Sequence, residues 1–428
     1  MSLSPIHPAD QLAMIMDRIY RFGMTTTSGG NLSILDENGD IWITPGGIDK
    51  GSLTRDDIVC IKPDGTITGK NKPSMELPFH REIYEKRPDV RAVVHAHPPA
   101  LVAFSIAGKV PNTRLIPSAY TICGEVGMAE YGLPGSVELG KKIVKVFERG
   151  FKSVILQNHG AVAVGGSLFD AFKTFETLDF CARLEINAYR IGKPLTLNEK
   201  HIELTKNTQD VNLKAFKPTG YNTIENNARQ DICRFVHRAY SQKLFTSTQG
   251  TVSQKLNDSS FLITPHNVDR KYIDANNIIH IDNGCMEEGK APGSSVILHK
   301  YIYDKHPHIN SVIIANPPNI MAFAVTGQPF DSRIIPESYI FLKNVRNMPF
   351  ESIFVQPEMV SDVFKKETPI VLVESNCAIV TGSSLLNAFD RLEVLEYSAK
   401  SILDSQYIGE IVKIDDLSIE EIDRTFLL

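Results

Sequence analysis

The stretches HPPALVAFSIAG at residues 97–108 and NPPNIMAFAVTG at residues 316–327 are two versions of one sequence, 219 positions apart. Two further pairs repeat at nearly the same spacing: WITPGGID at 42–49 with LITPHNVD at 262–269, and AVAVGGSLFDAF at 161–172 with AIVTGSSLLNAF at 378–389. Self-similarity at a fixed offset is the signature of a repeated structural unit. The chain therefore contains two copies of one fold.

The length of the chain agrees with this duplication. A chain of 428 residues exceeds what one hydrophobic core ordinarily supports, so two domains of roughly 200 residues are expected. We expect a first domain over residues 1–200 and a second over 223–428. The stretch 201–222, rich in Thr, Asn and Lys, is expected to be the linker.

Each copy alternates between strand and helix patterns, which predicts an α/β fold. In the first copy, apolar spacing predicts helices over 8–22, 76–87, from Pro99, and from Ser167 towards Ile191. Strands are expected over 31–35, 40–44, 92–97 and 153–164. The Asn38-Gly39 pair is typical of a hairpin turn between the first two strands.

Composition and charge exclude several classes of function. With 42% hydrophobic and 22% charged residues the chain is typical of a globular protein, and a net charge of -5 gives no basic surface for nucleic acid or anionic lipid. No apolar run approaches the ~20 residues that span a bilayer, and we find no secretory signal. Six cysteines without a C-x-x-C pair argue against a zinc ribbon or a disulfide framework. We expect a cytoplasmic protein that acts on a small molecule.

Three histidines of the first copy form a candidate metal site. His95 and His97 are two apart on a predicted strand, so both imidazoles can lie on one face at its end. His159 is expected to end another apolar strand, and a catalytic ion needs three protein ligands and an open position. Taken alone, the pattern favours ordinary surface or core histidines over metal ligands.

The second copy shows which histidines belong together. At the three matching positions stand Ile314, Asn316 and Asn376, so all three imidazoles are absent at once. In contrast, His80 persists as His299. We therefore predict that His80 serves the scaffold and that the three lost histidines form one functional unit.

The acidic residue Glu76 is the candidate general base. It is replaced by Ser295 in the second copy, together with the metal ligands. A lone helical Glu is usually only solvated. Beside a metal-bound carbonyl, however, a carboxylate can remove a carbon-bound proton while the cation stabilises the resulting enediolate.

With these residues assembled, the chain resembles the class II aldolase/adducin family and, within it, the fuculose-phosphate aldolases. The first copy carries the motifs in the order of the family: SGGNLS at 28–33, ITPGG at 43–47, PSMELPFH at 73–80, HAHPP at 95–99 and NHG at 158–160. The resemblance implies two tandem domains, each a mainly antiparallel β-sheet flanked by helices in three α/β/α layers. It also implies that the second domain is degenerate and lacks the metal ligands.

The resemblance assigns roles residue by residue. It places the ligands of Zn²⁺, or of another divalent transition metal, on His95, His97 and His159, and the acid–base carboxylate on Glu76. The residues implied for binding the substrate phosphate are Ser28, Gly30, Asn31, Gly46, Gly47 and Ser74. Gly46 and Met75 stand where the fuculose-phosphate aldolases carry hydroxyl residues, so the phosphate signature is weaker here.

Two tyrosines complete the implied catalytic set. Family aldolases use a tyrosine from across a subunit boundary to protonate the oxygen of the aldehyde half, and the matching residue is Tyr120. The second copy keeps it as Tyr339, which is equally compatible with a buried structural tyrosine. The sharper hypothesis is a homo-oligomeric ring in which the degenerate domain lends Tyr339 to the metal site.

The resulting expectation is reversible aldol cleavage of a sugar phosphate. The substrate would be a ketose 1-phosphate of the L-fuculose 1-phosphate type, and the products dihydroxyacetone phosphate and a short aldehyde. Ribulose-phosphate 4-epimerase is an alternative, although it carries an aspartate in place of Glu76. A decarboxylase or dehydratase of the same family is a further alternative, as is a non-catalytic, adducin-like binding module.

Overall fold

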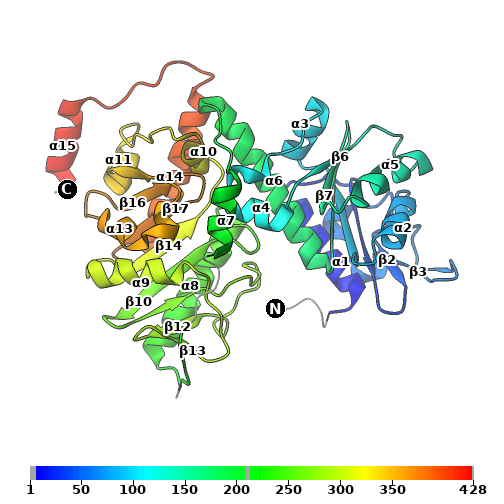
Figure 1. Cartoon of the computed structure of the whole chain (residues 1–428), viewed down its shortest axis with the longest axis horizontal. Coiled ribbons are helices and arrows are strands. Elements are labelled where there is room, and N and C mark those ends of the chain that lie inside the picture. Colours follow the sequence, from blue (N-terminus) through cyan, green and yellow to red (C-terminus); the bar gives the residue numbers. More distant parts are fainter. Residues whose placement is uncertain (1–5, 208–212, 219, 427–428) are drawn as a thin grey trace. The chain divides into compact units, whose positions relative to one another are not determined.

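The computed structural model describes residues 6–207, 213–218 and 220–426, and these form two compact units (Figure 1). The N-terminal unit comprises residues up to 113 together with 118–183, and the C-terminal unit comprises 114–117 and the residues from 184 onward. The domain boundaries expected from the sequence stay a prediction. The expected linker includes the end of helix α7 (Glu199–Asn207) and the short strand β9 (Ala215–Phe216), while 208–212 and 219 lie outside the described residues.

The N-terminal unit is built on an eight-stranded sheet in the order β4-β3-β2-β1-β5-β8-β7-β6. Its strands are β1 (Asn31–Leu35), β2 (Ile41–Ile43), β3 (Val59–Ile61), β4 (Ile67–Thr68), β5 (Ala92–Ala96), β6 (Gly127–Ala129), β7 (Ser153–Leu156) and β8 (Gly160–Gly165). Neighbouring strands run antiparallel, except β6 and β7, which are parallel. The mainly antiparallel sheet expected from the sequence is confirmed.

Helices cover both faces of this sheet. They are α1 (Pro8–Arg21), α2 (Leu77–Lys86), α3 (Pro99–Ala107), α4 (Pro117–Cys123), α5 (Val137–Phe147) and α6 (Leu168–Ile191). Apolar residues of α2 and α5 form one core with alternate residues of the strands, while α1 and α3 contact the sheet separately from this core. The three-layer arrangement is therefore confirmed.

The C-terminal unit repeats this architecture with one additional edge strand. Its sheet has the order β15-β16-β17-β14-β10-β11-β12-β13-β9, and all pairs are antiparallel except β15 with β16 and β13 with β9. The strands are β10 (Thr251–Asn257), β11 (Ser260–Ile263), β12 (Ile279–Asp282), β13 (Cys285–Glu287), β14 (Ser311–Ala315), β15 (Val345–Met348), β16 (Ile370–Val373) and β17 (Cys377–Gly382). The duplication seen in the sequence is thus a duplication of topology.

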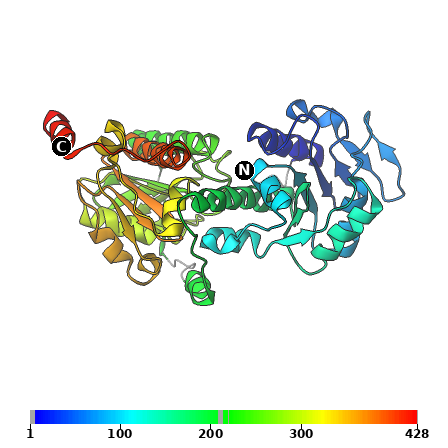
Figure 2. The same cartoon turned by 90° about the horizontal axis from the view of Figure 1, so that it is seen from above.

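The C-terminal unit contains the helices α8 (Thr223–Ser241), α9 (Val296–Lys305), α10 (Ile320–Thr326), α11 (Pro336–Leu342), α12 (Ser352–Val355), α13 (Pro357–Asp362), α14 (Leu385–Ser405) and α15 (Asp416–Phe426). Six of these helices, α8, α9, α10, α11, α13 and α14, follow the order of α1 to α6 in the first unit, and α12 and α15 are additional. In Figure 2, α8 (green) and α14 (red-orange) lie on one face of the sheet, and α9 and α13 share a core on the other.

One predicted strand is wrong. The stretch 153–164 forms two strands, β7 and β8, joined by a three-residue turn. Asn158, in the middle of this turn, has a left-handed backbone with φ 54°, a conformation that Asn adopts more readily than most residues. His159 therefore lies in a hairpin turn rather than at the end of a strand.

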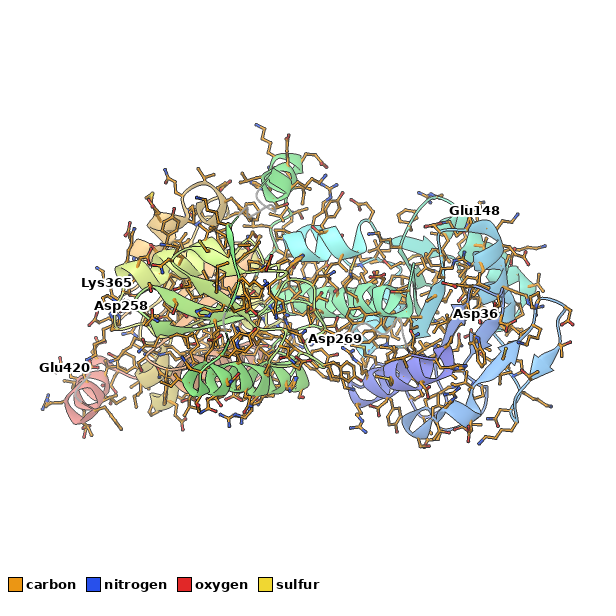
Figure 3. The ribbon with its side chains drawn as sticks, turned by 90° about the horizontal axis from the view of Figure 1, so that it is seen from below. Asp36, Glu148, Asp258, Asp269, Lys365 and Glu420 are labelled. Carbon is orange, nitrogen blue, oxygen red and sulfur yellow. The ribbon has the colours of Figure 1, made fainter. Side chains whose placement is uncertain are left out.

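Many charged side chains lie on the outside of both units. Glu148 of the first unit and Asp258 and Glu420 of the second, all labelled in Figure 3, are exposed. Within the described residues, we find no helix that combines the length and the apolar character needed to cross a membrane.

Candidate metal centre

Two adjacent strands and a hairpin turn bring the three predicted ligands together. His95 is the fourth residue of β5 and lies on the same face as Val93, whose side chain belongs to the core under α2. His97 follows the end of this strand, where its backbone N–H donates to the carbonyl of Met24. His159 comes from the β7–β8 turn, next to β5 in the sheet.

The three imidazoles face one another. The Nε2 atoms of His95 and His97 are 3.1 Å apart, and one nitrogen of each ring lies within 4.8 Å of the others. Ring centroids of the three pairs are separated by 4.8, 4.9 and 5.1 Å. Two nitrogens bound tetrahedrally to zinc at ~2.05 Å would be roughly 3.3 Å apart, so this spacing fits a shared cation.

Hydrogen bonding and burial prepare His95 to bind a metal. Its Nδ1–H donates to the carbonyl of Ala161 at 2.9 Å, which leaves the Nε2 lone pair directed at the cluster. Burial, together with the neighbouring imidazoles, lowers the pKa values of His95 and His97 to about 3. Both rings are therefore neutral near pH 7, as metal ligation requires.

Glu76 completes the cluster from the start of α2. It is the N-cap residue of that helix, and its side chain is 7% exposed. One carboxylate oxygen, Oε2, lies 3.3 Å from Nε2 of His95, and Oε1 lies 3.8 Å from Nε2 of His159. Oε1 is buried and has no hydrogen-bond partner among the described residues.

This donor set fits a divalent transition metal. Imidazole nitrogens are ligands that Zn²⁺ and similar ions prefer, and three of them leave a coordination position open for a substrate beside the Glu76 carboxylate. A buried carboxylate oxygen without a partner is costly unless a cation or a ligand satisfies it. Among the described residues, the three histidines are the one group of His, Cys, Asp or Glu side chains with this geometry.

A chain of buried hydrogen bonds begins at the Glu76 carboxylate and holds it in place. Asn31, the direct cross-strand partner of His95, donates from Nδ2 to Oε2 of Glu76 at 2.7 Å. The Oδ1 of Asn31 accepts from Nε2 of His80 at 2.5 Å, and Nδ1 of that ring contacts the hydroxyl of Ser33 at 2.6 Å. The hydroxyl of Ser33 also lies 2.6 Å from that of Tyr84. We call the residues Asn31, His80, Ser33 and Tyr84 the support chain.

The directions of these bonds are mutually consistent. Because Glu76 accepts, the amide nitrogen of Asn31 faces it and the amide oxygen faces His80. His80 must then carry its proton on Nε2, so its Nδ1 accepts from Ser33 and Tyr84 donates to Ser33. Burial holds the pKa of His80 well below its usual range, which keeps the ring neutral.

The second copy keeps the outer half of this support chain and loses the inner half. The hydroxyl of Ser253 contacts both His299 and Tyr303 at 2.6 Å, as in the first copy. Asn31 is replaced by Thr251, and Nε2 of His299 is buried without a partner among the described residues. The prediction that His80 belongs to the scaffold is consistent with this repetition.

In the second copy, the residues at the positions of the metal ligands make contacts of a different kind. The side chain of Asn316, which stands where His97 does, donates to the backbone carbonyl of Asn376. Ile314, which stands where His95 does, packs in the apolar core of the C-terminal unit. The geometry that gathers three imidazoles is therefore specific to the N-terminal unit.

The predicted phosphate-binding residues lie on three linked loops. Pro45 pairs with Pro73, which joins the turn of Gly46 and Gly47 to the segment of Ser74. Gly47 has φ +70° and open space around it, whereas the N–H of Gly46 donates to the carbonyl of Lys72. A side chain at Gly30 (φ +71°) would lie 2.7 Å from the carbonyl oxygen of His95, so packing alone requires this glycine. The exposed Ser28 lies on the third loop.

A buried lysine joins these loops. The backbone N–H of Lys50 donates to the carbonyl of Thr27, and its Nζ donates to the carbonyl of Pro45. The side chain is 2% exposed, and burial lowers its pKa to about 8. Arg270 occupies the same place in the second copy and makes the corresponding bonds to Ser247 and Pro265.

The two predicted tyrosines lie in different units. Tyr120 is on α4 and is half-buried. Tyr339 is on α11, where its hydroxyl donates to the carboxylate of Asp423 in α15 at 3.0 Å. Burial and the contact with Asp423 raise the pKa of Tyr339. In this arrangement the hydroxyl of Tyr339 already has a partner within its own unit.

Sequence reasoning missed the contributions of Ser33, Tyr84 and Lys50. A signal was available, because the two copies share Ser33 as Ser253 and Tyr84 as Tyr303. The side chain of Asn31, predicted to bind phosphate, instead contacts Glu76 and His80.

The sequences of both copies match a known protein family. A sequence profile of the "Class II Aldolase and Adducin N-terminal domain" matches residues 10–186 and 230–403. The L-fuculose phosphate aldolase of Methanococcus maripaludis is 37% identical over 172 residues, covering 40% of this chain and 89% of the relative. The 3-oxo-tetronate 4-phosphate decarboxylase of Haemophilus influenzae is 32% identical over 169 residues, and the match covers 39% of this chain and 80% of the relative.

Among solved structures, an L-fuculose 1-phosphate aldolase is 29% identical with a TM-score of 0.43, covering 47% of this chain and 94% of that one. The profile matches most of the chain in two segments, one for each copy. The chain belongs to the class II aldolase and adducin family, as an aldolase-type lyase built from two tandem copies of the family domain.

Proposed function

We propose that the N-terminal unit reversibly cleaves a ketose 1-phosphate of the L-fuculose 1-phosphate type into dihydroxyacetone phosphate and a short aldehyde. The observation that carries the proposal is the Glu76 carboxylate, buried beside three converging imidazoles. The similarity to the M. maripaludis L-fuculose phosphate aldolase, which spans most of that enzyme, supports the substrate class.

The residues proposed to hold Zn²⁺ are His95, His97 and His159. When bound, such a cation supplies Lewis-acid polarisation of the substrate carbonyl and stabilises negative charge on its oxygen. The Ala161 carbonyl keeps the His95 ring in the tautomer and orientation that this ligation needs.

Glu76 is proposed to move the proton. In the direction of synthesis, Oε1 takes the proton from the carbon next to the carbonyl of dihydroxyacetone phosphate, and in cleavage it returns that proton. Oε2 is held by the amide of Asn31, so the carboxylate presents the unpartnered Oε1. The support chain thereby fixes the base before the substrate binds.

The substrate phosphate is proposed to bind at the three linked loops, with Ser28, Gly47 and Ser74 as the contacting residues. Backbone N–H groups and hydroxyls at turns are suited to anions. The buried Nζ of Lys50 beneath the turn at 45–47 adds positive charge there.

A screen of ketose 1-phosphates for release of dihydroxyacetone phosphate tests the reaction. We expect turnover with at least one member of the panel and none with the unphosphorylated ketoses at the same concentration. Release of carbon dioxide from 3-oxo-tetronate 4-phosphate, with no cleavage of any ketose 1-phosphate, would favour the decarboxylase suggested by the H. influenzae relative.

The roles of the tyrosines require a separate test. We propose Tyr120 as the acid that protonates the aldehyde oxygen, with Tyr339 as its counterpart in a homo-oligomer. Phenylalanine at either position should lower turnover if its hydroxyl takes part. Unchanged turnover of a folded Tyr339→Phe protein would remove that residue from the mechanism and leave its bond to Asp423 as its role.

A further inference from the structure

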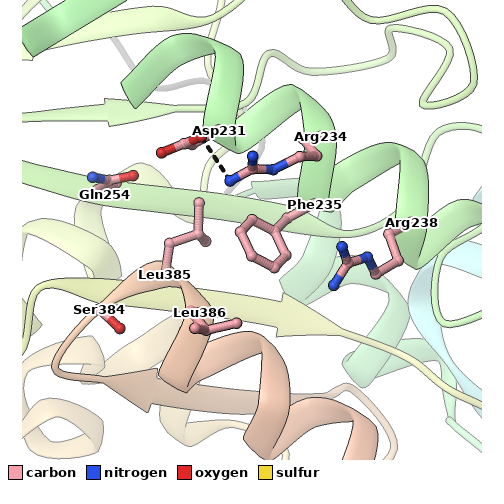
Figure 4. A pocket seen from close by; sticks show the side chains of 8 residues that line it. All are labelled: Asp231, Arg234, Phe235, Arg238, Gln254, Ser384, Leu385 and Leu386. Carbon is pink, nitrogen blue, oxygen red and sulfur yellow. Dashed lines mark ion pairs between the residues drawn. The ribbon is translucent and has the colours of Figure 1, made fainter. Parts of the chain in front are cut away.

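The C-terminal unit has a cavity that lies outside the region corresponding to the metal centre. It has a volume of about 390 Å³, within the range of small-molecule sites. It lies between α8, β10 and the start of α14 (Figure 4). The lining residues are Asp231, Arg234, Phe235, Arg238, Gln254, Ser384, Leu385 and Leu386.

Three of the residues that line the cavity differ between the two copies. Arg234 of α8 stands where the first copy has Met14, and Gln254 of β10 stands where it has Ile34. Leu386 replaces the larger Phe169. At two lining positions the second copy therefore has a polar side chain where the first has an apolar one, and at a third it has a smaller apolar side chain.

One arginine is common to both copies, but it is buried in the first copy and exposed in the second. Arg18 of the first copy lies over the ring of Phe172, and the matching Arg238 lies over the matching ring of Phe389. Arg18 is 1% exposed, whereas Arg238 is exposed. In the part of the chain that the structure describes, no carboxylate pairs with Arg238, so its charge is available to a ligand.

The remaining lining residues offer further polar groups. Arg234 pairs with Asp231 at 2.8 Å, but both side chains are largely exposed, and such pairs are weak. The Oε1 of Gln254 is buried and has no partner among the described residues. Leu385 and Leu386 form the first turn of the 21-residue helix α14, whose N-terminus favours negative charge.

We propose that this cavity binds the phosphate monoester of a small hydroxylated metabolite. Arg234, Arg238 and the first turn of α14 would bind the phosphate, since guanidinium groups and helix N-termini both suit its oxygens. Gln254 and Asp231 would hydrogen-bond hydroxyl groups of the carbon chain. The site lies in the copy that lacks the metal ligands, and it stands independently of the proposed aldolase reaction.

Amide hydrogen exchange of the full-length protein tests the proposal, with inorganic phosphate and glycerol 3-phosphate as probes. Sodium chloride at matched ionic strength serves as the reference. Either probe should slow exchange in peptides covering 383–389 and 252–256. Peptides of the N-terminal unit report separately on binding at the proposed active site.

The double variant Arg234→Met/Gln254→Ile restores the residues that the first copy carries at these positions. It should weaken binding of both probes at 383–389 at least about tenfold, the effect of one charge-assisted hydrogen bond. The matched control is Arg21→Met, which removes one exposed arginine from a similar helical pair with Asp17. It should leave the response at 383–389 unchanged.

Two results would overturn the proposal. One is the absence of slowed exchange at 383–389 with both probes at tens of millimolar. The other is an equal response in the wild type and the double variant. If inorganic phosphate slows exchange and glycerol 3-phosphate does not, the result supports an anion site. It contradicts the predicted contacts of Gln254 and Asp231 with hydroxyl groups.

Discussion

At the scale of single residues, the proposed proton transfer depends on how the Glu76 carboxylate is held. Asn31 fixes one carboxylate oxygen, and the other faces the imidazole cluster without a partner among the described residues. A glutamine at this position keeps the volume and the bond to one neighbour but cannot accept a proton. The Glu76→Gln substitution can therefore separate metal binding from proton transfer.

Glu76→Gln should retain the metal and lose turnover by about 10²- to 10⁴-fold, the usual contribution of a general base. Metal analysis and steady-state kinetics on the same preparation measure both quantities. Ser295, the matching residue of the second copy, gives the control, since Ser295→Ala should leave turnover unchanged. Near-normal activity of Glu76→Gln would assign proton transfer to another group.

Lys50 gives a prediction about pH. Burial lowers its pKa to about 8 from an ordinary value of 10.5, so the folded state is penalised when this lysine is charged. Between these values the unfolded chain binds more protons than the folded one, and the stability of the protein rises with pH. The penalty below pH 8 is on the order of 3 kcal/mol.

The comparison of Lys50→Met with the wild type isolates this effect. The wild type should gain stability relative to the variant as the pH rises from 8 to about 10, as followed by thermal unfolding in parallel series. Tyrosines and cysteines that titrate in the same range are common to both proteins and cancel. A difference that stays constant across this range would show that folding does not lower the pKa of Lys50.

At the scale of elements, the position of each ligand follows from strand pairing. His95 and Asn31 are direct partners on β5 and β1, and α2 covers the face on which they lie. The support chain links that face to α2 through His80 and Tyr84. Its outer half, the serine, histidine and tyrosine, recurs in the second copy as Ser253, His299 and Tyr303. The second copy therefore provides a control for substitutions in the support chain.

Ser33→Ala and Ser253→Ala remove equivalent hydroxyls from the two copies. Each should cost about 1–3 kcal/mol of stability, because a buried histidine and a tyrosine lose a partner. Only Ser33→Ala should lower kcat, by several-fold with little change in KM or metal content, since only His80 reaches Glu76 through Asn31. Equal kcat values for Ser33→Ala and Ser253→Ala would show that the support chain has only a structural role.

The elements also show how far sequence reasoning extends. Apolar periodicity predicted α1, α2 and α6, because the side chains of these helices must bury a regular stripe. It missed the β7–β8 turn, where an Asn in a left-handed conformation interrupts an apolar stretch. The three histidines were found because they disappear together in the second copy, whereas the support chain depends on contacts across 45 to 51 residues that no local pattern records.

At the scale of the whole molecule, the two units share a topology and differ in chemistry. The N-terminal unit gathers His95, His97 and His159, and the C-terminal unit has an isoleucine and two asparagines in their place. A ligand that binds only one folded unit stabilises that unit alone. The response to metal should therefore be confined to the N-terminal unit.

Removal of the metal with a chelator should speed amide exchange in peptides covering 92–97 and 156–160. The matching peptides of the second copy, 311–316 and 373–377, should not respond. A free-metal concentration a thousand times Kd corresponds to about 4 kcal/mol of stabilisation, which is large enough to measure. Equal responses in both units would contradict a centre restricted to the first copy.

The most direct test of the central claim is the metal content per chain of the wild type, His95→Ala and Asn316→Ala. We predict one divalent ion per chain in the wild type and in Asn316→Ala, and none in His95→Ala. Full metal content in His95→Ala, or two ions per chain in the wild type, would contradict a single centre built by the three histidines of the N-terminal unit.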